Sequence, residues 1–351
     1  MGNAIIISAL AFFQSIIAPA YQDFAPADPT NVPGFLSEFT LMDNVVTKRQ
    51  IITIRKTGNI LQRRDAGCDL VYKKIAGADV RQIETTELYG ATQQCNHEFY
   101  QDCLRDWRNN DPLFADKITP FFKQTLALDL VSNAYFGDTS RANNPLAKWS
   151  TNKFDGVFRW MVKYYKGGMI TPEKGIALAA TDFAEQPTLA RGLIVQMYNK
   201  QDVLMRAQPA TDKEFSVTQA IYDGYESYLD QTVSGSAVGA SVIVDGQPRV
   251  AYKGIPLVVR SLWQPILTEL YGENANAAVL TLKGNFVFGT DKEYGEDNGE
   301  VDETGKPMHD ALMVWYEKKD LSWYYQMFLK AGTQIALPEY VVFAVPPAML
   351  A

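Results

Sequence analysis

The stretch "AAVLTLKGNFVFGTDKEYG", residues 277–295, decides how the last third of the chain is interpreted. A run of apolar and β-branched residues leads to Gly284, and Gly289 follows five positions later, directly before Thr290. This is the glycine spacing of the Walker phosphate-binding loop, but that loop requires a lysine before the hydroxyl residue and a helix after it. The pattern provides neither. The two glycines therefore predict a turn and a strand end in a β-rich region, with no phosphate site.

The composition is that of an ordinary globular protein. Of 351 residues, 47% are hydrophobic and 21% are charged, which is enough chain for two or three lobes with cores of their own. The net charge of −7 argues against a protein that grips nucleic acid through its overall charge, because neutralising phosphates requires surplus Lys and Arg. The three cysteines, Cys68, Cys95 and Cys103, are too few for a disulfide framework.

The N-terminal segment "AIIISALAFFQSIIAPA", residues 4–20, is apolar. It resembles a signal peptide at its end, but the first basic residue is Lys48, and a secretory signal has a positive start. The run is also short for a membrane span and is interrupted by Gln14 and Ser15. We interpret it as an apolar arm that needs a partner surface, with a signal peptide and a membrane anchor as the alternatives.

The first half of the chain changes from extended to helical patterns. Residues 18–34 contain four prolines and predict an extended connector. Residues 56–95 are rich in Lys and Arg, carry turn signals at Gly58 and Gly67, and show no core face, which predicts a protruding β-hairpin. Beyond it, apolar residues recur every four positions, and a long helix is predicted within residues 119–137.

The second half alternates helices with strands. Ser216 is predicted to cap one of the helices, and Asp245-Gly246 is predicted to form a hairpin turn. The helices are predicted within 154–168, 188–207 and 216–231, and the strands of the last third over 277–289, 311–317 and 321–328, with a final strand bounded by Pro338. The fold class is therefore α+β.

Catalytic chemistry has few candidates. The chain has two histidines, His97 and His309, and the serines at 234–239 miss the G-x-S-x-G spacing of a nucleophile elbow. We assign no catalytic residue and no cofactor-binding residue.

Metal ligands are also weakly indicated. Cys68, Cys95, His97 and Cys103 have the residue types of a zinc site, but Cys103 falls on the apolar stripe of a predicted helix. The acidic run 291–306 misses the glycine position of a calcium-binding EF-hand loop. A solvated loop is the simpler interpretation, and no metal residue is assigned.

Taken in order, these parts resemble the major capsid proteins of tailed bacteriophages, the HK97-fold family. The resemblance rests on "LTLKGNFVFGTD" (280–291), the hairpin-like "ALMVWYEKKDLSWYYQMFLKAGTQIALPEYVVF" (311–343), "RVAYKGIPLVVRSL" (249–262) and the helical pattern within 193–231. It covers residues 40–345 in the order of the parts. The apolar first 17 residues and the acidic insertion at 291–306 depart from the family pattern.

The resemblance implies a division of the chain. An N-terminal arm would take residues 1–55 and an extended β-hairpin loop residues 56–95. A peripheral domain with a spine helix would combine residues 96–150 and 310–351, and an axial domain would take residues 151–309. The arm and the hairpin are then expected to make few contacts with their own chain.

The role that the resemblance implies is structural, and no enzyme activity is expected. Copies of the chain would assemble as hexamers and pentamers into the icosahedral shell around the double-stranded DNA of a tailed phage. The other partners implied are scaffolding, portal and decoration proteins, and DNA held without sequence-specific contacts, with no membrane. The location implied is the virion, after assembly in the host bacterial cytoplasm.

Three alternatives stay open, namely an encapsulin-type shell protein, another structural component of a virion, and a metal-dependent hydrolase. Some family members crosslink subunits through a lysine of the extended loop, where this chain has Lys73 and Lys74. No partner side chain is fixed by the sequence, so crosslinking is not predicted.

Overall fold

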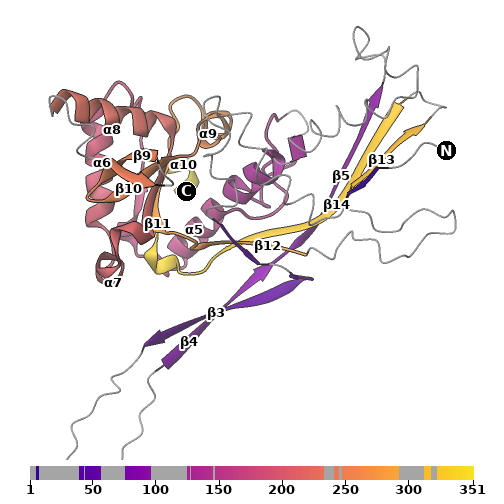
Figure 1. The fold of residues 1–351 in the computed structure, drawn as a ribbon, viewed down its shortest axis with the longest axis horizontal. Coiled ribbons are helices and arrows are strands. Elements are labelled where there is room, and N and C mark those ends of the chain that lie inside the picture. Colours follow the sequence, from indigo (N-terminus) through magenta and orange to yellow (C-terminus); the bar gives the residue numbers. More distant parts are fainter. Residues whose placement is uncertain are drawn as a thin grey trace, which may run out of the picture.

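Helices and strands both contribute to the structure, a computed structural model, and the strands form two large sheets and a separate two-stranded sheet (Figure 1). The α+β class expected from the sequence is confirmed. The residues that the structure describes are 5–7, 39–42, 44–56, 76–95, 125–126, 128–144, 147–232, 241–244, 247–291, 312–317 and 322–351.

The seven-stranded sheet is the middle layer of one part of the molecule. Each side chain of β15 is buried, as are the first four of β11, which is typical of strands covered on both faces. The strands, in spatial order, are β6 (Gly175–Ala177), β15 (Val342–Val345), β11 (Ala278–Leu282), β7 (Lys213–Val217), β10 (Ile255–Val259), β9 (Gln247–Tyr252) and β8 (Ser241–Val244).

Helices cover both faces of this sheet. Leu280 points into a core shared with α6 and α8, whereas the neighbouring Val279 points into a core shared with α5, α9 and residues 128–136. The helices are α5 (Val157–Lys166), α6 (Pro187–Asn199), α7 (Val203–Ala207), α8 (Gln219–Thr232), α9 (Trp263–Tyr271) and α10 (Pro347–Leu350), with 3₁₀ turns η3 (Pro172–Lys174), η4 (Ala210–Asp212) and η6 (Pro338–Tyr340). Two helices therefore lie on the opposite side of the sheet from α5.

The six-stranded sheet is organised by one long strand, β14 (Ser322–Ile335). One side of β14 pairs with β5, and its other side pairs first with β13 and then with β12. The remaining strands are β1 and β2, which pair with β13 and β12. The bounds are β1 (Ile5–Ile7), β2 (Phe39–Met42), β5 (Thr86–Cys95), β12 (Phe286–Thr290) and β13 (Leu312–Glu317).

Strands β12 and β13 lie in line along the same side of β14. Thr290 pairs with Ala331, and Leu312 pairs with Met327, so both strands run antiparallel to β14 on that side. The acidic segment that separates them in the sequence therefore leaves and rejoins the sheet within a short span of β14.

The opening stretch of the sequence links the two large sheets, because β11 belongs to one and β12 to the other. The turn between them places Gly284 at φ +72°, a conformation that glycine adopts without steric cost. Asn285 next to it donates to the Leu337 carbonyl (3.0 Å) and accepts from the Leu337 N–H (2.7 Å). The predicted turn is confirmed. It is held by Leu337, which follows the end of β14 at Ile335.

The projecting hairpin consists of β3 (Lys48–Lys56) and β4 (Ala76–Glu84), which form the two-stranded sheet (Figure 1). The sequence predicts this hairpin over residues 56–95, and that extent is wrong at both ends. The ladder starts at Lys48, and residues 86–95 form β5, which pairs with β14 of the same chain. Only Thr85 separates β4 from β5, too few residues for a hairpin turn, so β5 pairs elsewhere.

Other boundaries also differ from the sequence patterns. The sequence predicts that Ser216 caps a helix, but Ser216 lies in β7, and α8 begins only at Gln219. Its hydroxyl donates to the Glu214 carboxylate of the same strand and is therefore not used as a helix cap. Strand β14 extends well past the predicted end at 328. Strands β8 and β9 pair antiparallel, with Val244 opposite Gln247, and the predicted turn residues between them, 245–246, lie outside the described part of the chain.

Two strands belong to a different sheet from most of the expected domain range in which they fall. Strand β15 lies in the seven-stranded sheet although it belongs to the range 310–351, and β12 lies in the six-stranded sheet although it belongs to 151–309. The domain division itself stays a prediction.

Several predicted features lie wholly or partly outside the described residues. The connector at 18–34 is outside, and the long helix is seen at residues 125–126 and 128–136. Within the described part of the chain, no helix combines the length and apolar character needed to cross a membrane.

Aromatic side chains fill the core beneath the second face of the seven-stranded sheet. Trp263 at the start of α9 lies edge-on to Tyr135 (5.2 Å between ring centroids) and to Phe158 (5.0 Å), and Phe136 stacks on Phe158 (4.8 Å). Trp263 is 1% exposed. It therefore holds α9 to α5 and to the helical residues 128–136.

Trp263→Ala is expected to lower the free energy of unfolding by about 3–5 kcal/mol, because it removes a large buried ring and leaves a cavity. Val203→Ala, at a side chain 80% exposed, is the control and should change it by less than about 0.5 kcal/mol. Urea unfolding of the purified protein, followed by circular dichroism, measures both. Equal losses for the two variants would contradict this assignment of the core.

Candidate functional site

The candidate site is the base of the projecting hairpin, where it crosses the six-stranded sheet. Gly289 of β12 and Gly332 of β14 are cross-strand partners, and together they form what we call the glycine notch. A Cβ atom on Gly332 would lie 2.0 Å from the carbonyl oxygen of Glu84, and one on Gly289 would lie 2.8 Å from Cδ1 of Ile83. The hairpin backbone can approach β14 this closely only because Gly332 has no side chain, and Gly289 leaves room for the side chain of Ile83.

Hydrogen bonds fasten the hairpin base on both sides of the notch. Some join backbone groups and others use long side chains of β4 and β14 to reach backbone carbonyls. They are Val45 N–H to the Thr290 carbonyl (3.0 Å), Thr85 Oγ1 to the Val45 carbonyl (2.8 Å), Arg81 Nη1 to the Ala336 carbonyl (2.5 Å) and Gln334 Nε2 to the Gln82 carbonyl (2.9 Å). A small apolar cluster of Val45, Ile51, Ile83 and Val287 lies under them. The base is therefore fixed to the sheet.

Lys330 adds an ionic contact beside the notch. Its Nζ donates to the Val46 carbonyl (2.9 Å) and lies 3.6 Å from Oδ2 of Asp291 and 3.5 Å from Oε1 of Glu87. The side chains of Lys330 and Asp291 are each 8% exposed, whereas that of Glu87 is 68% exposed. Lys330 therefore joins the hairpin base, β5 and the start of the acidic segment.

Beyond its base the hairpin exposes apolar side chains. Ile52 and Val80 are cross-strand partners and are 59% and 53% exposed. Ile51, next to Ile52, points to the opposite face and is buried. An exposed apolar pair on a projecting hairpin is unfavourable in isolated subunits and is typical of a surface that contacts a partner.

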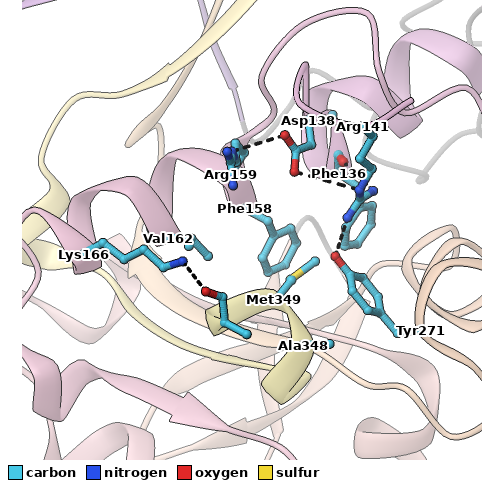
Figure 2. A pocket seen from close by; sticks show the side chains of 12 residues that line it. Phe136, Asp138, Arg141, Phe158, Arg159, Val162, Lys166, Tyr271, Ala348 and Met349 are labelled. Atoms are coloured by element: carbon cyan, nitrogen blue, oxygen red, sulfur yellow. Dashed lines mark hydrogen bonds and ion pairs between the residues drawn. The ribbon is translucent and has the colours of Figure 1, made fainter. Parts of the chain in front are cut away.

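The structure also contains a cavity of about 240 Å³ between α5, α9 and the C-terminal segment (Figure 2). Asp138 forms ion pairs with Arg159 (3.3 Å) and Arg141 (3.9 Å), and Arg141 donates to the Tyr271 hydroxyl. Burial raises the pKa of Tyr271, which keeps its hydroxyl protonated, although Arg141 acts in the opposite direction. The polar groups around this cavity thus pair with one another and join these segments.

The residues singled out as chemical candidates are only partly described. Thr290, the hydroxyl residue directly after the second glycine, is buried in β12 and donates to the Lys330 carbonyl (3.0 Å). Cys95 ends β5 and Asp291 follows β12. Outside the described residues lie Cys68, His97, Cys103, His309, Lys73, Lys74 and the rest of the acidic run, 292–306. Among the residues that are described, no three His, Cys, Asp or Glu side chains are grouped to hold a metal.

Sequence reasoning missed two residues of the site, Gly332 and Lys330. A glycine inside a strand pattern signals a close backbone approach, and Gly332 in "KAGTQ" carries that signal. Nothing in the local sequence shows that Lys330 lies opposite Asp291. That contact depends on the register of β12 against β14.

No protein-family model matches the chain, and no curated protein matches it in sequence. Solved structures do match it in shape. A chain of the satellite phage P4 procapsid, in a structure that includes the size determination (Sid) protein, superimposes with a TM-score of 0.53 and 11% identity, covering 89% of this chain and 86% of that one. The capsid of Myoviridae phage XM1 gives a TM-score of 0.48 and 9% identity, covering 88% and 90%. The holo-SrpI encapsulin of Synechococcus elongatus PCC 7942 gives 0.43 and 10%, covering 93% and 94%.

The similarity to the P4 procapsid chain shows a shared fold. The fold that the sequence resemblance implies, that of HK97-type capsid proteins, is therefore confirmed.

Gly332→Ala is expected to lower the free energy of unfolding by about 1–3 kcal/mol, because the new methyl group overlaps the Glu84 carbonyl and forces β4 away from the sheet. Gly192→Ala, in the middle of α6 with no atom near the new Cβ, is the matched control. It should raise stability by up to about 1 kcal/mol through helix propensity. Urea unfolding tests both, and a neutral Gly332→Ala would contradict the notch.

Lys330→Met is expected to cost about 3–5 kcal/mol, because it leaves the buried Asp291 carboxylate without its cation. The control is Lys48→Met, whose partner Glu84 is 57% exposed and whose ion pair should contribute less than about 1 kcal/mol. The same unfolding measurement compares them. Similar losses for the two lysines would show that the contact at Lys330 is an ordinary surface pair.

Proposed function

We propose that the protein is the major capsid protein of a tailed bacteriophage. Its copies assemble as hexamers and pentamers into an icosahedral shell around double-stranded DNA. The observation that carries the proposal is the hairpin β3–β4, which is anchored at the glycine notch and projects from a chain with the HK97-type fold. An anchored arm of this kind has a mechanical use when another subunit lies beneath it.

The exposed pair Ile52 and Val80 supports contact with another copy. Burying both side chains at a subunit boundary removes the cost of exposing them to water. A single contact of this size is weak, but a closed shell repeats it in every subunit, and the repeated contacts stabilise one another through effective concentration. A rigid base with a projecting arm also suits a subunit that must occupy both hexamers and pentamers.

The role we propose is structural, without catalysis. In support, the polar groups around the cavity near Tyr271 are engaged in ion pairs and hydrogen bonds with one another. Three of these contacts, Arg159–Asp138, Arg141–Tyr271 and Lys166–Ala351, link separate segments of the fold. We also propose that the protein resides in the virion after assembly in the host bacterial cytoplasm. Scaffolding, portal and decoration proteins are its proposed further partners, and the packaged DNA is held without sequence-specific contacts.

The full chain, expressed alone and with a scaffolding protein, is expected to form closed shells visible by negative-stain electron microscopy. Ile52→Ser combined with Val80→Ser should abolish closed shells while changing subunit stability little, because both side chains are exposed in the subunit. A monodisperse monomer at every concentration, with and without the scaffold, would overturn the proposal. Shells that hold protein cargo and no DNA or portal would instead identify an encapsulin-type compartment.

A further inference from the structure

Helix α8 carries a stripe of acidic residues. Asp223, Glu226 and Asp230 are spaced three and four residues apart, so they lie on one face, and all three are at least partly exposed. The helix contains no Lys or Arg, so it supplies no opposite charge of its own. Like charges at these spacings destabilise a helix.

The position of the acidic stripe along α8 destabilises the helix further. Asp230 lies in the last turn of α8, where the helix dipole disfavours negative charge, and this turn has no basic residue. Asp223 accepts a hydrogen bond from Gln219, but no described residue forms an ion pair with Glu226 or Asp230. The nearby Arg191 lies over the ring of Tyr228. No ion pair among the described residues therefore offsets the destabilisation of α8 by Glu226 and Asp230.

Helix α5 carries the complementary stripe. Arg159, Lys163 and Lys166 lie four and three residues apart on one side of the helix, and residues 136–168 hold six Lys or Arg against two Asp in a chain of net charge −7. Each of the three has a partner in its own chain, since Arg159 pairs with Asp138, Lys163 pairs with Asp155, and Lys166 donates to the Ala351 carbonyl. Burial alone would raise the pKa of Asp155, but hydrogen bonds from Lys163 and Thr139 outweigh it and lower that pKa. The local acids therefore offset only part of the positive charge.

The two stripes match in length, since the first and last residues of each are seven positions apart along the helix, or about 10 Å. Glu226 lies near the middle of one and Lys163 near the middle of the other, so these two residues face each other whether the helices run parallel or antiparallel. Within one subunit the helices lie on opposite faces of the seven-stranded sheet and cannot meet. The two stripes can therefore meet each other only between copies.

We propose that α8 of one copy docks through this acidic stripe on the basic stripe of α5 in the adjacent copy. The inference rests on the proposed function, because it names a contact by which subunits assemble. Different surfaces meet in such a contact, so it is a head-to-tail interface, and repeating it around an axis closes a ring. The opposite charges also select against pairing α8 with α8 or α5 with α5.

Glu226→Lys combined with Asp230→Lys tests the acidic stripe. Thermal unfolding of the subunit should stay the same or rise, because the change relieves like-charge contacts and places a cation at the helix end. Assembly, followed by light scattering and electron microscopy at fixed salt, should require about a tenfold higher protein concentration. Glu185→Lys with Glu273→Lys makes the same charge change at other exposed residues and should assemble within about twofold of wild type.

Charge exchange identifies the partner. Lys163→Glu with Lys166→Glu should also impair assembly, and combining it with the two α8 substitutions should restore assembly to within about threefold of wild type. Lys163 pairs with Asp155, so this variant is first checked for folding by circular dichroism. If it is unfolded, Lys166→Glu alone is combined in turn with Asp223→Lys and Asp230→Lys, and one of the two should restore assembly.

The outcomes separate this inference from the proposed function. Wild-type shells together with normal assembly of the α8 variant would overturn the α8–α5 contact and leave the capsid proposal in place. Loss of assembly that no exchange restores would show that α5 is not the partner, and would overturn the contact as well. A wild-type chain that never forms shells would overturn the proposed function, and the contact with it.

Discussion

The close approach of the hairpin base to Gly289 and Gly332 is the constraint on which the rest of the architecture depends. These glycines are adjacent on neighbouring strands, and the Glu84 carbonyl lies over Gly332 and the Ile83 side chain over Gly289 at distances that a methyl group would prevent. The crossing fixes where β3 and β4 leave the sheet and where β5 begins its pairing with β14. The direction of the projecting hairpin is therefore set by the absence of side chains at Gly289 and Gly332. The hydrogen bonds of the hairpin base then hold it in that direction.

The same stretch of chain connects this anchor to the second sheet. Residues 278–290 contribute one strand to each large sheet, and the turn at Gly284 lies between them, held by Asn285 against Leu337. Helices pack on both faces of the seven-stranded sheet, and on one face Trp263 packs α9 against α5 and the helical residues 128–136. A force applied to the hairpin would thus be transmitted through β12 into a core that is covered on both sides. This suits a subunit whose arm is held by a neighbour.

Local chemistry made part of this fold predictable. The turn at Gly284 follows from the glycine in the sequence, the pairing of β8 with β9 agrees with the Asp-Gly between them in the sequence, and the end of α5 follows from Gly167 and Gly168. The order of the parts was enough to indicate the family fold. The extent of the projecting hairpin was not predictable, because residues 76–84 and 86–95 have similar strand character but pair with different strands. Partner choice depends on contacts between residues far apart in the sequence, as with Gln82 and Gln334, which no local pattern reports.

Strands β12 and β13 lie in line on β14, and this arrangement has a consequence for the variability of the protein. Only residues 328–330 of β14 separate the pair Thr290–Ala331 from the pair Leu312–Met327, whereas residues 291–311 separate the two strands along the chain. The long ladder therefore keeps its register whatever the length of the chain between the two strands, and loop length adds little free-energy cost. This position is a natural graft point. Insertions after Asp291 are therefore expected to leave the pairing of β12 and β13 with β14 unchanged.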